Sequence, residues 1–310
     1  MHARMKAIVL GLGLGLTGMG HAALADDAAA AIFGERQLAL AVDDRCHLFT
    51  DGQRNALDAA RLQARGLLLR EGIARQALDD YTADLHRQAA GIACADDAVA
   101  DLQHRVVNAY AGWVRIPAME FPGRHFTWTA SRTVMPDTPV WSIRQDQGDF
   151  VVGVSTRDDR RQLSFALAGQ PDATSAILVL RDMDRQPTLY DATMGGIYAG
   201  PTEAAWARWT PPRFAETRIW ARGHNAGRLA ATLAETEDAA TLFDFPMSAA
   251  DALAARDPRE AARIDLMDRH GRITASHYIE IGDFAAALAF LRGGDQRDLA
   301  GSSAPEPSAP

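Results

Sequence analysis

The sequence predicts an α+β protein: an N-terminal, disulfide-closed unit of three helices, followed by an antiparallel β-sandwich or open barrel with a C-terminal helix. Apolar residues recur at three- and four-residue spacing over much of residues 44–120, as in amphipathic helices. Short runs of alternating polarity with turn residues between them dominate residues 121–292, as in antiparallel sheets. Cys46 and Cys94, the two cysteines of the chain, flank the first two helical segments.

The N-terminus has the three parts of a secretory signal peptide. Arg4 and Lys6 precede an uncharged run over residues 7–20, and the small-x-small sequence of residues 23–25 follows it. The run contains a GxGxxG pattern, but it lacks the helix and the later acidic residue that a dinucleotide-binding loop needs. We therefore expect residues 1–25 to be a signal peptide, and the mature chain to be periplasmic or secreted by a bacterium.

The charge of the mature chain excludes several classes of partner. Removal of Arg4 and Lys6 takes the formal net charge from −8 to −10. An acidic chain without basic runs is not expected to bind nucleic acid or an anionic membrane surface. No later apolar run is long enough for stable membrane insertion. Metal-site patterns such as HExxH and CxxC are missing from the sequence, so we expect no metal and no cofactor.

The helical unit is expected at residues 44–120, after an N-terminal arm at residues 26–43. Thr50 and Gln53 have the spacing of a capping box, which predicts the start of the first helix. A second helix follows it, and a third amphipathic helix is expected at residues 99–113, before a proline.

The first two helices should form an antiparallel hairpin. Cys46 precedes the first helix and Cys94 follows the second, so the hairpin brings the two cysteines together. In an exported chain this arrangement predicts a disulfide bond between them.

The β domain is expected at residues 121–292. The connections between its first strands are too short for crossover helices, which favours antiparallel pairing. Strands are predicted at residues 126–131, 140–144, 150–155, 162–167, 176–180, 217–221 and 243–246, followed by a helix at 248–256, a hairpin of 262–269 with 272–281, and a terminal helix after Asp283. The composition of residues 293–310 is that of a disordered tail.

The end of the chain has a characteristic order of elements. A strand, a helix and a hairpin precede Gly282-Asp283-Phe284 and the last helix, while Trp141-Ser142-Ile143 forms an earlier tryptophan-containing strand. Over residues 140–292 this order resembles the invasion-associated locus B family of exported bacterial proteins. The resemblance implies a β-rich, periplasmic, non-catalytic protein. This chain lacks the family's cysteines in the sheet region and adds the helical unit.

Two regions are candidates for a functional site: the long segment at residues 188–212 and the turn expected at residues 223–227. Long loops in compact domains are often functional, and tryptophan, tyrosine and arginine dominate binding hot spots. The alternative is that the tryptophans fold back to cover the sheet. The candidate binding residues are Tyr198, Trp206, Trp209, Arg222 and His224.

The catalytic patterns are weaker than the binding ones. Ser155 follows the first half of a GxSxG pattern but lacks its second glycine, so we interpret it as an ordinary strand residue. His277 shares the alternating face of Ile273 and Ile279 and is expected to be a core histidine with a backbone partner.

We therefore expect an exported, non-enzymatic protein that binds an envelope protein or another envelope component through loops of the β domain. The alternative is a periplasmic hydrolase that uses Asp191, Glu203 or His224.

Overall fold

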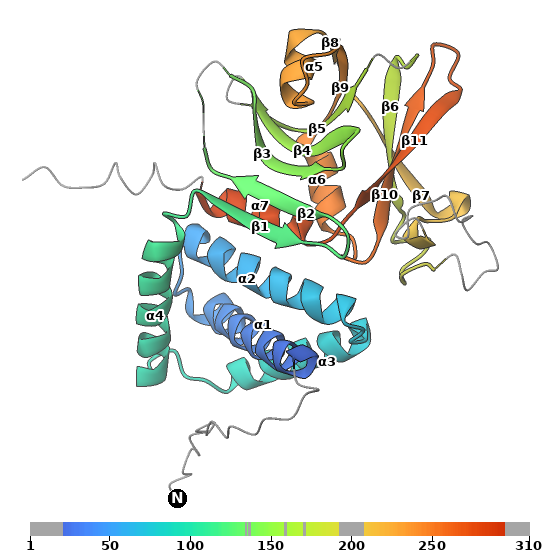
Figure 1. Cartoon of the computed structure of the whole chain (residues 1–310). Helices are drawn as coiled ribbons and strands as arrows, with labels where there is room; N and C mark the ends of the chain where they lie inside the picture. Colours follow the sequence, from blue (N-terminus) through green and yellow to red (C-terminus); the bar gives the residue numbers. More distant parts are fainter. Residues whose placement is uncertain are drawn as a thin grey trace, which may run out of the picture.

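The computed structural model describes residues 21–133, 135, 138–157, 160–169, 172–191 and 208–294. Four helices form one side of the molecule and two antiparallel sheets form the other (Figure 1). The predicted architecture is confirmed: a helical region with a disulfide bond precedes antiparallel sheets and a C-terminal helix. Over the described residues the sheets remain open and do not close into a barrel.

The helical unit contains one helix more than the three expected. Its helices are α1 (His21–Cys46), α2 (Asp51–Arg70), α3 (Arg75–Ala90) and α4 (Asp97–Trp113). The extra helix is α1, which occupies the residues that the sequence analysis assigned to an arm. Its buried side includes Ala29 and Phe33, and Phe33 joins the apolar cluster that contains Leu69 and Leu78. The buried side also includes Gly34, Gln37 and Asp43, so the apolar helical period was weak in the sequence.

The predicted start of α2 and the predicted disulfide are both confirmed. The Gln53 amide donates to the Thr50 hydroxyl at 3.4 Å, and the Thr50 amide donates to the Gln53 side-chain oxygen at 2.9 Å, which makes a capping box. Cys46, at the end of α1, is bonded to Cys94, between α3 and α4, and their Cα atoms are 5.5 Å apart. The bond closes the helical unit at one end.

The large sheet has seven strands and the small sheet has four, and every pair of neighbours is antiparallel. The large sheet has the order β1 (Ala118–Pro122), β2 (Thr127–Ser131), β3 (Val140–Asp146), β4 (Phe150–Arg157), β5 (Arg160–Ala168), β9 (Ala240–Phe245) and β8 (Gly223–Ala226). The small sheet has the order β11 (Ile273–Glu280), β10 (Ala261–Met267), β6 (Ser175–Arg181) and β7 (Glu216–Trp220).

One hydrophobic core joins the two sheets and two helices. Phe165 of the large sheet and Ile264 of the small sheet belong to the same buried cluster, together with residues of α6 (Met247–Ala254) and α7 (Phe284–Gly294). Figure 1 shows α7 between the large sheet and α2, so α7 connects the core to the helical unit.

The turn expected at residues 223–227 is a strand in the structure. The chain crosses here from one sheet to the other: the Ala221 amide donates to Ala176 of the small sheet, and the Arg222 amide donates to Asp244 of the large sheet. β8 follows and pairs with β9, and the short helix α5 (Arg228–Leu233) comes next. β8 is short and polar, so its pairing with β9, and not its side-chain pattern, makes it a strand.

Candidate functional site

An apolar hollow lies in the helical unit, where α4 meets α1 and α2. Its volume is about 590 Å³, within the range of about 300–1,000 Å³ that is usual for small-molecule sites. We call it the helical groove. Its apolar lining is Leu38, Ala39, Val42, Ala56, Leu57, Ala60, Ile92, Ala98, Val99, Leu102, Val106, Ala109, Tyr110 and Trp113.

Small side chains on the facing helices leave part of the space beside α4 unfilled. α4 presents Leu102 and Val106 toward α1 and α2. The facing helices contribute Ala39, Ala56 and Ala60, whose methyl groups leave space that larger side chains would fill. Lining residues span nearly the whole of α4, a length of about 22 Å at the helical rise.

Charged and polar side chains border the groove: Glu35 and Arg36 of α1, Gln53 of α2 and Arg105 of α4. Arg36 is 3.5 Å from its neighbour Glu35, and both side chains are exposed. Within the described part of the chain, Arg105 has no carboxylate within ion-pair distance. The rim therefore carries a cation on each of two helices.

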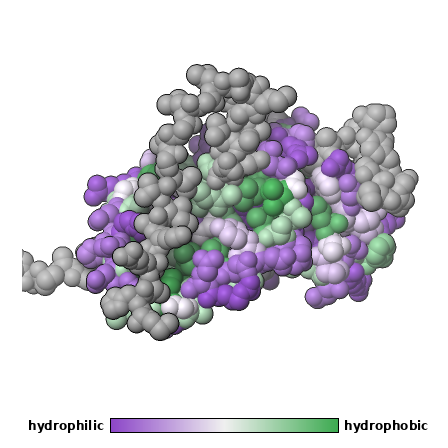
Figure 2. All heavy atoms as spheres, turned by 90° about the horizontal axis from the view of Figure 1, so that it is seen from below, coloured by the Kyte–Doolittle hydropathy of each residue, from purple (hydrophilic) through white to green (hydrophobic). Residues whose placement is uncertain are grey.

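Figure 2 shows the molecule from the side of the helical unit. Hydrophobic side chains gather near the middle of this face, and hydrophilic side chains surround them. An exposed hydrophobic patch with a hydrophilic border is a common mark of an interaction site.

At the end of α4 the groove meets α7. The Tyr110 hydroxyl donates to the Gly293 carbonyl at 3.2 Å, and the Trp113 ring meets Phe290 edge-on at 5.3 Å between centroids. Both aromatic residues also line the groove. This end of the groove is thereby joined to the core of the β domain.

The structure describes some of the binding residues expected from the sequence and not others. Tyr198 and Trp206, and Glu203 of the hydrolase alternative, lie outside the described residues. Trp209 is half-buried, with the Arg208 guanidinium 4.2 Å from its ring centroid.

Arg222 and His224 lie at the β8 edge of the large sheet. Both are exposed, and the His224 ring is stacked on Phe243 with centroids 5.0 Å apart. The structure thus brings these two residues to one edge.

A buried polar cluster beside this edge escaped the sequence analysis. Ser155 and Ser164 have their hydroxyl oxygens 2.7 Å apart, and Ser164 donates to Asp244 at 2.8 Å. Arg157 and Asn225 donate to the other oxygen of Asp244, at 2.8 and 3.3 Å. The cluster holds the buried charge of Asp244 and ties four strands together, so Ser155 has a structural partner. The signal in the sequence was polar residues at alternate positions of β4 and β5.

His277 is half-buried against the core, and the predicted backbone partner is wrong. Its Nε2 atom is buried and makes no hydrogen bond with any described residue. The ring instead packs against Phe150 and Phe165, with centroids 5.2 and 5.3 Å away. Burial lowers the pKa of the His277 imidazole, and the nearby charge of Asp149 opposes this shift.

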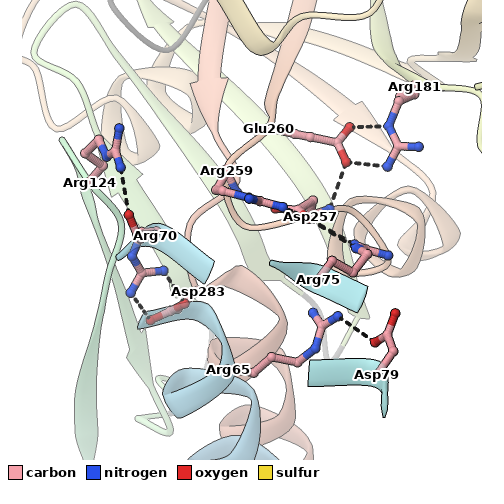
Figure 3. A network of polar contacts seen from close by, with 10 residues as sticks. All are labelled: Arg65, Arg70, Arg75, Asp79, Arg124, Arg181, Asp257, Arg259, Glu260 and Asp283. Atoms are coloured by element: carbon pink, nitrogen blue, oxygen red, sulfur yellow. Dashed lines mark hydrogen bonds and ion pairs between the residues drawn. The ribbon is translucent and has the colours of Figure 1, made fainter. Parts of the chain in front are cut away.

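Ion pairs join the helical unit to the β domain (Figure 3). Arg70 of α2 donates both ends of its guanidinium to Asp283 at 2.6 and 2.9 Å. Burial raises the pKa of the Asp283 carboxyl, and the guanidinium opposes that shift. The backbone carbonyl of Arg70 accepts a hydrogen bond from Arg124 at 2.8 Å.

A second buried carboxylate, Asp257, lies nearby in the turn after α6. It accepts hydrogen bonds from Arg75 of α3 at 3.1 Å and from Arg259 at 2.9 and 3.0 Å. Burial alone would raise the pKa of Asp257, but the hydrogen bonds and charges of the two arginines outweigh it and hold the pKa below its usual value. Its backbone amide donates to Glu260, which pairs with the buried Arg181 (Figure 3). The carboxylates of Asp283 and Asp257 thus hold the helical unit and the β domain together.

Among the described residues, no helix combines the length and apolarity needed to cross a bilayer. Comparisons with protein-family models, with curated proteins and with solved structures found no match, so the resemblance to the invasion-associated locus B family stays a prediction.

Proposed function

We propose that this chain is an exported, non-enzymatic binding protein whose helical groove holds an amphipathic ligand with an acyl chain and an anionic head group. The observation that carries the proposal is the apolar groove of about 590 Å³ between α1, α2 and α4. The sequence analysis expected binding through loops of the β domain, and the proposal moves the site to the helices.

The shape of the groove favours an extended apolar chain. Mostly apolar side chains, aliphatic and then aromatic, line it along about 22 Å of α4. An unbranched acyl chain can follow such a path and remove this surface from water, at a gain of about 0.8 kcal/mol per buried methylene.

The charges at the rim favour an anionic head group. Arg36 and Arg105 stand on two of the three helices that form the groove. Among the described residues that line it, the one carboxylate is that of Glu35, which is adjacent to Arg36. A carboxylate or phosphate can accept charge-assisted hydrogen bonds from a guanidinium at this position.

Export is supported by the leader-like N-terminus and by the disulfide bond. Such bonds persist in oxidising compartments, where an exported carrier would meet free acyl chains or lipids.

The experiment is a fluorescence titration of residues 26–310 with 11-(dansylamino)undecanoic acid, followed by displacement with hexadecanoate. We expect saturable binding, displacement by hexadecanoate, and little displacement by hexadecyltrimethylammonium, which has the same chain but the opposite charge.

Two pairs of variants distinguish binding in the groove from binding elsewhere on the surface. Ala56→Phe fills the groove and should abolish binding, whereas Ala77→Phe, on an exposed position of α3, should leave it unchanged. Arg105→Gln should weaken hexadecanoate binding about two- to fivefold, and Arg115→Gln should not. A lack of saturable binding, or equal losses in the variants and their controls, would overturn the proposal.

A further inference from the structure

A second hollow lies on the large sheet and shares no lining residue with the helical groove. It is formed by β2, β3, the residues just before β3 and the C-terminal end of α5, and its volume is about 400 Å³. We call it the sheet hollow. Its lining consists of Thr129, Ser131, Thr133, Pro139, Val140, Trp141, Arg144, Thr232, Leu233 and Glu235.

One wall of the sheet hollow is a row of hydroxyl groups. Thr129 and Ser131 occupy alternate positions of β2, and Thr133 follows two residues later, so the first two side chains share a face of the strand. Each hydroxyl can both donate and accept a hydrogen bond. Such a wall suits a ligand that is itself rich in groups able to do both.

Beside this row lies an ion pair, whose Arg144 is the cross-strand neighbour of Thr129. Arg144 and Glu235 form a salt bridge in which both side chains are more than a third exposed. Glu235 has a φ of +52°, a left-handed conformation that is uncommon for a residue with a side chain. This conformation ends α5, where the Thr236 amide donates to the Ala231 carbonyl at 3.1 Å. The pair offers donors and an acceptor in fixed positions while contributing no net charge.

The third component is an aromatic ring with a fixed orientation. The Trp141 indole nitrogen donates to the Leu233 carbonyl at 2.8 Å, and the side chain is half-buried in the lining. Its ring supplies apolar surface beside the hydroxyl row. A pyranose has the matching surfaces, with C–H groups on its faces and hydroxyl groups at its rim.

We propose that the sheet hollow binds a neutral oligosaccharide, with Trp141 against a sugar ring and with Thr129, Ser131 and the Arg144–Glu235 pair bonding to its hydroxyls. A charged ligand is disfavoured because the two charges of the lining neutralise each other. The proposal is independent of the helical groove, which differs in lining and in position. Together the two sites would let the protein bind a glycan and an acyl ligand at once.

The test is isothermal titration calorimetry of residues 26–310 with cellotetraose, maltotetraose and the tetramer of N-acetylglucosamine. We expect saturable binding of at least one tetramer. Thr129→Val removes one hydroxyl without changing the side-chain shape and should weaken that binding about three- to tenfold. Glu235→Gln should weaken it similarly.

The matched control is Thr127→Val, on the same face of the same strand but outside the lining. It should leave the affinity unchanged. The unfolding midpoints of all variants show whether the fold is intact. Trp141→Phe is a further variant, which keeps an aromatic ring at this position. Failure of all three tetramers to bind at millimolar concentration would overturn the proposal, as would equal weakening by Thr127→Val.

Discussion

The guanidinium of Arg70 and the carboxylate of Asp283 form a two-point ion pair between residues 213 positions apart in the sequence. Arg70 is the last residue of α2, and Asp283 directly precedes α7. Both side chains are almost fully buried. The pair therefore fixes the position of the helical unit against the end of the β domain.

Loss of one partner of this pair should be costly. Asp283→Asn leaves the Arg70 charge buried without its counterion, and we expect the free energy of unfolding to fall by about 3–5 kcal/mol. The control is Asp79→Asn, which removes the partner of Arg65 at 3.6 Å on a half-exposed site and should change stability by less than about 0.5 kcal/mol. Urea denaturation measures both. Similar small losses in the two variants would contradict a structural role for the buried pair.

A glycine next to the pair provides a steric test. A Cβ atom at Gly66 would lie 1.9 Å from the Asp283 Oδ1 atom and 3.0 Å from Arg70 Nη1. Gly66→Ala should therefore displace the carboxylate and lower the unfolding midpoint, although alanine is the better helix former by about 1 kcal/mol. Gly112→Ala, in α4 with open space around it, should stabilise the protein or leave it unchanged. A stabilising Gly66→Ala would contradict the observed packing.

The disulfide bond should make a large contribution to the stability of the helical unit. Cys46 and Cys94 are 48 residues apart, and in the chain-entropy model a loop of this length contributes about 4 kcal/mol. We expect the double variant Cys46→Ala/Cys94→Ala to unfold at a lower urea concentration than the oxidised protein. A reducing agent should lower the midpoint of the natural chain and leave that of the double variant unchanged. Insensitivity of the natural chain to reduction would count against the bond.

The stability of the protein should depend on pH through His277. Burial lowers the pKa of this imidazole, so the folded state binds the proton less readily than the unfolded state, in which the pKa is about 6.5. The neutral His277 side chain therefore stabilises the folded state at pH values above the pKa of the unfolded state. This stabilisation is lost as the pH falls through that pKa toward the lower pKa of the folded state.

His277→Phe should therefore flatten the dependence of unfolding free energy on pH between about pH 7.5 and pH 5.5. His104→Phe, at an exposed position of α4, should keep the natural dependence. Identical pH profiles for the natural chain and the His277 variant would show that another group is responsible.

Export should remove the first 25 residues. α1 begins at His21, and cleavage after Ala25 would leave Asp26 and Asp27 at its new N-terminus, where negative charge is favourable. Mass spectrometry of the exported protein should find a chain that starts at Asp26. Ala25→Tyr should block processing and Ala28→Tyr should not, whereas an exported chain that still starts at Met1 would contradict the signal peptide.

The elements that could be predicted from the sequence are those with a local cause. The capping box at Thr50 needs two residues three positions apart, and β4 is a short run rich in valine, a residue that favours strands. α1 was missed because glycine and polar residues interrupt the apolar period of its buried side, and β8 was missed because its residues are largely polar and it is held by pairing with β9. The helical groove has no sequence motif, because it depends on which residues of α1 and α2 face α4.

The sequence by itself determined the helical and sheet regions, the partner of each cysteine and the expectation of a leader, because these depend on spacing along the chain. Tertiary structure alone decided that Arg70 meets Asp283, that His277 packs against two phenylalanines, and that Thr129 and Ser131 line the same hollow as Glu235. These are contacts between distant segments. Their free energy depends on burial and on distances between atoms, which exist only once the two sheets and the helices have packed together.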